Sequence, residues 1–98
     1  MMVEEQTPHP TFEISCVDEA TVKYTESGRH ILIDVELQQG LISTERIIHT
    51  NSIDLWIDPE DGSSVPVSTI DRKVITYRLQ GSHPLRRKKF RIEEDSPD

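Results

Sequence analysis

The sequence predicts one α+β domain, in which a small antiparallel sheet of about five strands, ordered as a meander, is covered on one face by one C-terminal helix. Apolar and polar residues alternate through five short segments between residues 11 and 57, as in strands with one dry face. The only segment with signals for a helix start and stop follows them, at residues 69–79. The 98 residues suit one small domain. We expect it over residues 11–81, between flexible tails at 1–10 and 82–98.

Three strands are expected in the first half of the chain, at residues 11–17, 20–26 and 30–38. The pair Ser27-Gly28 separates the second from the third. Because glycine adopts a positive φ at little cost, this pair predicts a two-residue hairpin turn. The third segment alternates most clearly, with an aliphatic residue at every second position. It therefore predicts a sheet with one dry face and one wet, acidic face.

Two further strands are expected at residues 41–49 and 52–57. The first has a polar middle, which indicates an edge strand or a bulge. In the second, the alternation places the three aliphatic residues toward the core. On this register Trp56 would lie on the outer surface.

Residues 69–79 fit both a helix and a strand, and we favour a helix because both ends carry cap residues. Ser68 suits an N-cap, and Gly81 suits a C-cap. The helix would cover the dry face of the sheet, which otherwise has nothing to pack against. The side chains expected on one helical face are Ile70, Val74 and Tyr77.

Charge is distributed unevenly along the chain. Residues 1–80 hold 14 acids and 6 bases, whereas residues 81–98 hold 4 acids and 5 bases. An acidic domain repels nucleic acid and speeds the encounter with a basic partner. The single cysteine, Cys16, cannot form an internal disulfide, which fits a reducing compartment. With no apolar signal-peptide core and no apolar run of membrane-spanning length, we expect a soluble, cytoplasmic protein without membrane contacts.

The sequence contains no motif for catalysis, a cofactor or a metal. Its four histidines match no zinc spacing, and a calcium loop ending at Gly62 would contain Pro59. Phosphate-binding glycine loops and hydrolase nucleophile motifs are absent. We therefore expect a non-enzyme without cofactor or metal. An enzyme of unrecognised type is a lesser alternative, and its structural sign would be a pocket holding His49 with two carboxylates.

Four short features follow one another in a fixed order: Tyr24-Thr-Glu-Ser-Gly-Arg29, a strand ending Val35-Glu36-Leu37, Ser52-Ile-Asp-Leu-Trp56, and Pro59. In this order they resemble a family of small immunity proteins from bacterial polymorphic and contact-dependent toxin systems. The resemblance covers roughly residues 20–80. It implies a compact, cytoplasmic, non-catalytic α+β domain with a helix after the Trp-Pro segment, which binds a cognate toxin domain and blocks its activity.

The chain departs from the family pattern in two places. Pro59 lies further from Trp56 than the pattern suggests, and the basic-then-acidic segment after Gly81 has no counterpart. The role of that segment stays open. A second function is therefore an adaptor whose basic residues 86–91 contact nucleic acid or a membrane surface, although the acids at 93–98 would compete.

The candidate binding surface is acidic and surrounds the outward tryptophan. Tryptophan is enriched among residues that dominate binding energy, and acids steer a basic partner. A nuclease toxin, basic where it binds its substrate, would fit such a surface. Cover of Trp56 within the chain, by the helix expected at 69–79 or by a tail, is the alternative. The expected partner-binding residues are Trp56, Asp54, Asp58, Glu60, Asp61, Asp34 and Glu36.

Overall fold

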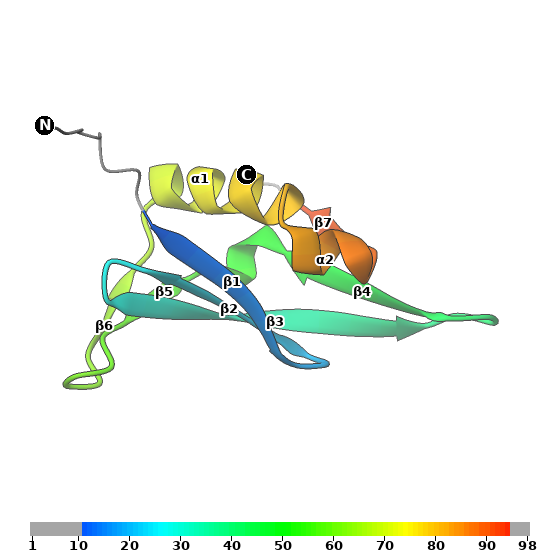
Figure 1. Ribbon diagram of the computed structural model, residues 1–98, viewed down its shortest axis with the longest axis horizontal. Helices are drawn as coiled ribbons and strands as arrows, with labels where there is room; N and C mark the ends of the chain where they lie inside the picture. Colours follow the sequence, from blue (N-terminus) through cyan, green and yellow to red (C-terminus); the bar gives the residue numbers. More distant parts are fainter. Residues whose placement is uncertain (1–10, 95–98) are drawn as a thin grey trace, which may run out of the picture.

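The computed structural model describes residues 11–94, without the side chain of Pro84, and confirms the α+β class. A mixed sheet lies on one side of the molecule and two helices lie on the other (Figure 1). Residues 1–10, expected to form a tail, lie outside the described residues, as do 95–98. The elements are β1 (Phe12–Asp18), β2 (Thr21–Glu26), β3 (Arg29–Gln39), β4 (Thr44–His49), the 3-10 turn η1 (Thr50–Ser52), β5 (Leu55–Ile57), β6 (Ser64–Pro66), α1 (Thr69–Gln80), α2 (His83–Arg87) and β7 (Phe90–Glu93).

The long strand β3 is the hub of the sheet. Its first half pairs with β2, and its second half pairs with β4. The strand order is β1-β2-β3-β4-β7, while the short β5–β6 hairpin joins at β3. The prediction of a five-stranded antiparallel meander is therefore wrong. Residues 11–94 form seven strands, and β7 runs parallel to β4.

The hairpin between β2 and β3 turns at the predicted pair. Ser27 has φ 55° and Gly28 has φ 80°, so both residues are in the left-handed region. Two such residues form a turn whose twist matches that of the flanking strands. The turn fixes the register in which Tyr24 lies opposite Ile31 and Val22 lies opposite Ile33, all of them in the core.

Helix α1 occupies the segment where a helix was favoured over a strand. The Asp71 N–H donates to Ser68 Oγ at 3.0 Å, so Ser68 is the N-cap as predicted. The face formed by Ile70, Val74 and Tyr77 is not the one that packs on the sheet, however. The buried residues of α1 are Ile75, Thr76 and Leu79, whereas Ile70, Val74 and Tyr77 are 73%, 41% and 76% exposed. Both sets of residues are apolar enough to pack on the sheet, and the sequence alone did not show which set would do so.

The C-terminal segment belongs to the folded domain, which corrects the expectation of a detached tail from residue 82. After Gly81 the chain forms α2, turns, and adds β7 beside β4. Leu85 is buried in the core, and Phe90 and Ile92 pack against it. These are the only strongly apolar residues in a highly charged stretch, and burying them recruits the whole segment. Because β7 pairs with β4, β4 lies inside the sheet and is not the edge strand that the sequence indicated.

The core lies between the sheet and the helices. It combines buried side chains of β2, β3 and β4 with Trp56, Val67 and the inner residues of both helices. Cys16 packs against this core and is partly buried. Within residues 11–94, no helix has both the length and the apolar character needed to cross a membrane.

Candidate protein-binding surface

Trp56 is a core residue and not the outward anchor that strand alternation predicted. Its side chain is 4% exposed, and its ring centroid lies 6.0 Å from that of Tyr24. The Cζ atom of Arg29 lies 4.1 Å from the centroid on the ring face. The register failed because residues 50–52 form the turn η1 and β5 begins only at Leu55. Trp56 therefore faces inward and Leu55 faces outward. The chain itself covers Trp56, as the alternative predicted, and Tyr24 and Arg29 are among the covering residues.

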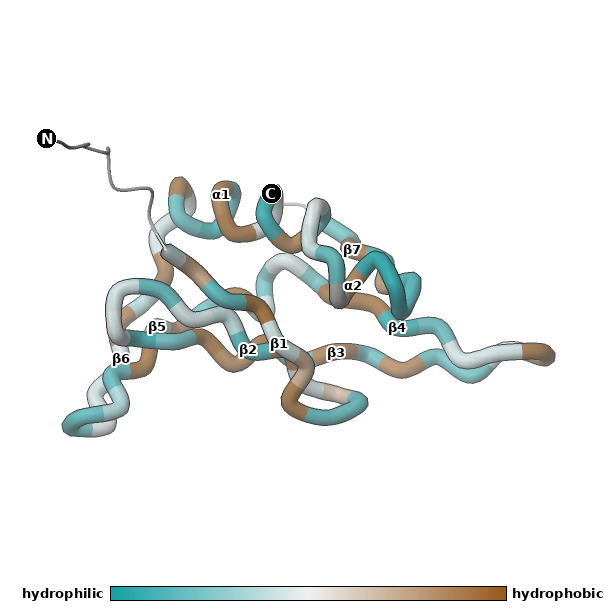
Figure 2. The backbone as a smooth tube through the Cα atoms, viewed as in Figure 1, coloured by the Kyte–Doolittle hydropathy of each residue, from teal (hydrophilic) through white to brown (hydrophobic). Residues whose placement is uncertain are grey.

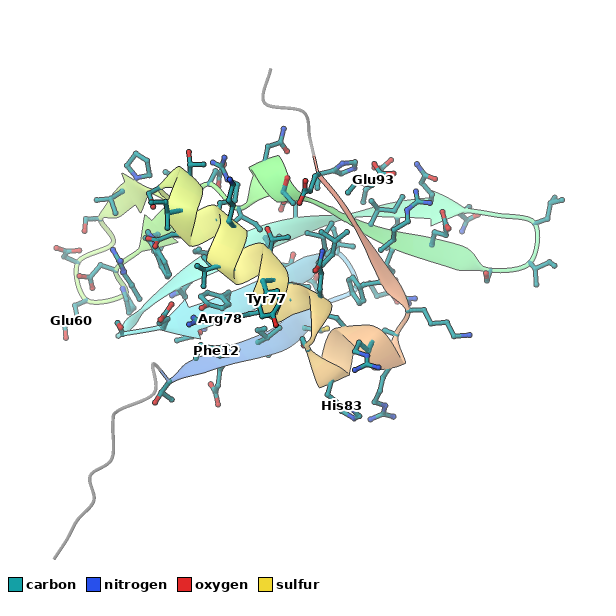
Figure 3. All side chains as sticks on the ribbon, turned by 90° about the horizontal axis from the view of Figure 1, so that it is seen from above. Phe12, Glu60, Tyr77, Arg78, His83 and Glu93 are labelled. Atoms are coloured by element: carbon teal, nitrogen blue, oxygen red, sulfur yellow. The ribbon has the colours of Figure 1, made fainter. Side chains whose placement is uncertain are left out.

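Three of the predicted acids lie in the loop between β5 and β6. Asp58 Oδ1 accepts a hydrogen bond from the Glu60 N–H at 2.9 Å, and Asp61 Oδ1 accepts one from the Ser63 N–H at 2.8 Å. The bonds from the backbone and side chain of Ser63 lower the pKa of Asp61. Glu60 lies at the far end of this hairpin, away from both helices (Figure 3). These acids are exposed, but at least two have a local structural role.

Asp34 and Glu36 lie on the opposite face of β3 from the buried Ile33 and Val35. Neither helix of the described part of the chain covers that side of the sheet (Figure 1). Alternation on each strand and the pairing between strands place further side chains on it. We name this surface the helix-free face and define it by His30, Leu32, Asp34, Glu36, His49, Leu55, Arg91 and Glu93.

Two exposed leucines form the apolar part of the helix-free face. Leu32 is 44% exposed and Leu55 is 41% exposed. In the antiparallel pairing of β3 with β5, His30 lies opposite Ile57, which brings Leu55 level with Leu32. Asp34 follows on the same face of β3. Asp54 directly precedes Leu55 and is also exposed, and its backbone C=O accepts from the Val67 N–H at 2.9 Å.

A polar network continues the helix-free face across β3, β4 and β7. Glu36 Oε1 and His49 Nε2 are 2.5 Å apart, and His49 Nδ1 lies 3.7 Å from Glu93 Oε1. Arg91 pairs with Glu93 at 3.1 Å and with Glu45 at 3.6 Å. The hydrogen bonds from His49 and Gln38 lower the pKa of the Glu36 carboxyl.

Reasoning from the sequence missed this network because Arg91 and Glu93 were assigned to a tail. The available signal was the alternation of Phe90 and Ile92 with these two charged residues. Alternation over four residues is the pattern of a half-buried strand. Read in that way, it would have placed both charges on the outer side of a strand.

The cluster of His49 with two carboxylates is the sign that was expected for an unrecognised enzyme. Here it lies on an open sheet face, and all three side chains are partly exposed. Catalytic groups are more often found in a cleft with strong desolvation. Among the described residues, no group of three or more His, Cys, Asp or Glu side chains has the arrangement of a metal site.

The structure thus divides the seven predicted site residues. Asp34 and Glu36 share the helix-free face, and Asp54 flanks its apolar pair. The loop acids Asp58, Glu60 and Asp61 form a separate group, and Trp56 is internal. Comparison of the chain with protein-family models, curated proteins and solved structures finds no match.

Proposed function

We propose that this protein is a non-catalytic inhibitor that occludes a basic protein partner with its helix-free face, as an immunity protein occludes a toxin domain. The observation that carries the proposal is the exposed pair Leu32 and Leu55 beside Asp34 and Glu36, on a sheet face without helical cover. Apolar contact at the centre with charge around it is the usual composition of a protein interface.

The form of the surface supports a macromolecular partner. Small ligands usually bind in concave sites that bury most of their surface. The helix-free face is instead the outer side of an extended sheet (Figure 1). An extended face of this kind can cover a partner's substrate site without any chemistry of its own.

The charge of the sheet supports a basic partner. Between residues 11 and 68 the chain holds eleven acids and three bases. A field of this sign speeds association with a positive surface and disfavours nucleic acid. A toxin that binds nucleic acid through a basic cleft would suit this surface, and an inhibitor of such a toxin would act in the cytoplasm.

Residues that carry the resemblance to immunity proteins contact one another in the core. Tyr24 and Arg29, from the first of its sequence features, both contact Trp56 from the third. These features therefore build the core, and related proteins would share them regardless of the partner. Residues that select one toxin belong on the surface, where Leu32, Asp34 and Leu55 lie.

The test is growth rescue. A toxin-like domain encoded beside this gene is expressed in a bacterium with and without the protein. The proposal predicts restored growth and a 1:1 complex that co-purifies. A toxic domain that this protein neither binds nor neutralises would contradict the inhibitory role.

A further inference from the structure

Helix α1 carries a second apolar stripe that faces away from the sheet. Ile70, Val74 and Tyr77 follow one another at spacings of four and three residues, which places them on one side of the helix. All three are exposed, and Tyr77 projects from the outer side of α1 (Figure 3). Helices that are apolar on two sides are usually buried on both. The described residues cover only the side with Ile75 and Leu79.

Cations are concentrated in the part of the chain that carries this stripe and in the segment that follows it. Residues 69–89 contain seven Lys or Arg residues and one Asp, a net charge of +6. Two of the cations have internal roles: Arg72 Nε donates to the Ile53 C=O at 3.1 Å, and Arg78 bonds Tyr24 and Glu26. The other five are exposed, and no acid in the described part of the chain pairs with them: Lys73, Arg86, Arg87, Lys88 and Lys89.

We propose that the surface formed by the apolar stripe of α1 and these five cations, here called the helix surface, docks on an anionic lipid membrane. Ile70, Val74 and Tyr77 would enter the boundary between headgroups and acyl chains, and the cations would contact lipid phosphates. This inference goes beyond the inhibitory role, which uses the other side of the molecule. It also departs from the expectation of no membrane contact, because peripheral docking needs no spanning segment.

Charge and chemistry favour a lipid surface over the other occupants. A second copy packed symmetrically on this surface would bring two sets of five exposed cations together. Nucleic acid would use the cations, but its phosphates would leave the exposed aliphatic side chains of α1 without a partner. The helix-free face, with Asp34, Glu36 and Glu93, lies on the opposite side of the sheet (Figure 1). Salt at 0.1 M screens charges over about 10 Å, so the acids on the helix-free face have a weaker effect on the potential at the cations.

The test is sedimentation of the purified full chain with lipid vesicles at about 0.1 M salt. One vesicle type contains phosphatidylcholine alone, and the other contains about 30 mol% phosphatidylserine, so that only the second is anionic. The account predicts binding to the anionic vesicles, little binding to the neutral ones, and loss of binding as salt is raised. No partner protein is needed, so the outcome is independent of the growth-rescue test.

Two double variants test the two parts of the helix surface. Each cation near an anionic membrane strengthens binding by roughly fivefold, so Arg86→Gln with Arg87→Gln should weaken it at least tenfold. Ile70→Ser with Tyr77→Ser should weaken it similarly. The control Lys23→Gln, on β2, should leave vesicle binding unchanged. All variants are first checked for the wild-type circular dichroism spectrum and melting temperature.

Absence of sedimentation with anionic vesicles would overturn the proposal. So would equal binding of the wild-type protein and both double variants. A parallel measurement with a DNA duplex at the same salt separates the nearest alternative. Binding to the duplex together with no binding to vesicles would assign the cations to phosphate backbones and would also overturn the lipid assignment.

Discussion

The guanidinium of Arg29 lies over the indole ring of Trp56, with Cζ 4.1 Å from the ring centroid. A cation on the face of tryptophan is favourable, and here it also shields the ring from water. Together with Tyr24, Arg29 accounts for the position of a tryptophan that strand alternation had placed on the surface. Trp56 is thus a determinant of the fold.

Replacement of Trp56 by alanine should destabilise the protein. Loss of a large buried aromatic side chain typically costs about 3–5 kcal/mol, a large part of the stability of a domain this small. Urea unfolding followed by circular dichroism measures the change. Trp56→Phe is the matched control and should cost less. An alanine variant as stable as the wild type would show that the side chain is not packed in the core.

The contact between Arg78 and Tyr24 links α1 to the sheet. Arg78 Nη1 donates to Tyr24 Oη at 2.5 Å and lies 3.3 Å from Glu26 Oε2, and Tyr24 Oη donates to Glu26 at 2.9 Å. Arg78→Ala should cost about 1.5–3 kcal/mol, because it leaves a mostly buried carboxylate without its cation.

Lys73→Ala on the exposed side of the same helix is the control, and we expect a change within about 0.5 kcal/mol. Chemical denaturation of both variants provides the comparison. Equal effects of the two substitutions would mean that the network with Tyr24 contributes nothing to stability.

The hydroxyl of Tyr24 should lose its proton at a higher pH than the hydroxyl of an exposed tyrosine. Burial raises the pKa of its hydroxyl to about 12, with opposing hydrogen bonds from Arg78 and to Glu26. The folded state holds the proton more tightly than the unfolded state, whose tyrosine pKa is about 10. This contribution to stability is therefore complete below pH 10 and is lost as the pH rises toward 12. In the Tyr77→Phe variant, Tyr24 is the only tyrosine, and tyrosinate absorbance should appear near pH 12. Absorbance that appears near pH 10 while the fold is intact would contradict the burial.

Truncation after Gly81 should unfold the domain. It removes Leu85 from the core and β7 from its pairing with β4. We expect loss of the cooperative thermal transition that the full chain shows. A stably folded chain that ends at Gly81 would instead support the boundary expected from the sequence, residues 11–81. Because residues 82–94 belong to the fold, truncation cannot distinguish binding by the basic residues 86–91 from binding by the acidic face. Point substitutions are needed for that comparison.

The sequence predicted the elements whose signals are local. The strands at β1, β2 and β3, the turn at Ser27-Gly28 and the cap at Ser68 each follow from residues within a few positions. Asp34 and Glu36 were correctly placed on the wet face because β3 alternates over many residues. The short β6, which contains Pro66, was missed.

The errors concern features that depend on distant parts of the chain. The three-residue strand β5 carries too little alternation to set its own register, so the turn η1 reversed the predicted side of Trp56. Helix α1 has two apolar stripes, and only the sheet selects Ile75 and Leu79. The segment after Gly81 is highly charged, and three apolar residues gain burial only once β4 and α1 are in place.

The most direct test of the central claim is charge reversal on the helix-free face. Asp34→Lys with Glu36→Lys is compared with Glu19→Lys, in the turn after β1, for binding to a toxin domain that the wild-type protein neutralises. Isothermal calorimetry gives the affinity. The account predicts a loss of at least 100-fold for the double variant, about 2.7 kcal/mol, and less than threefold for the control. Unchanged affinity of a folded double variant would show that the partner binds elsewhere and would contradict the account.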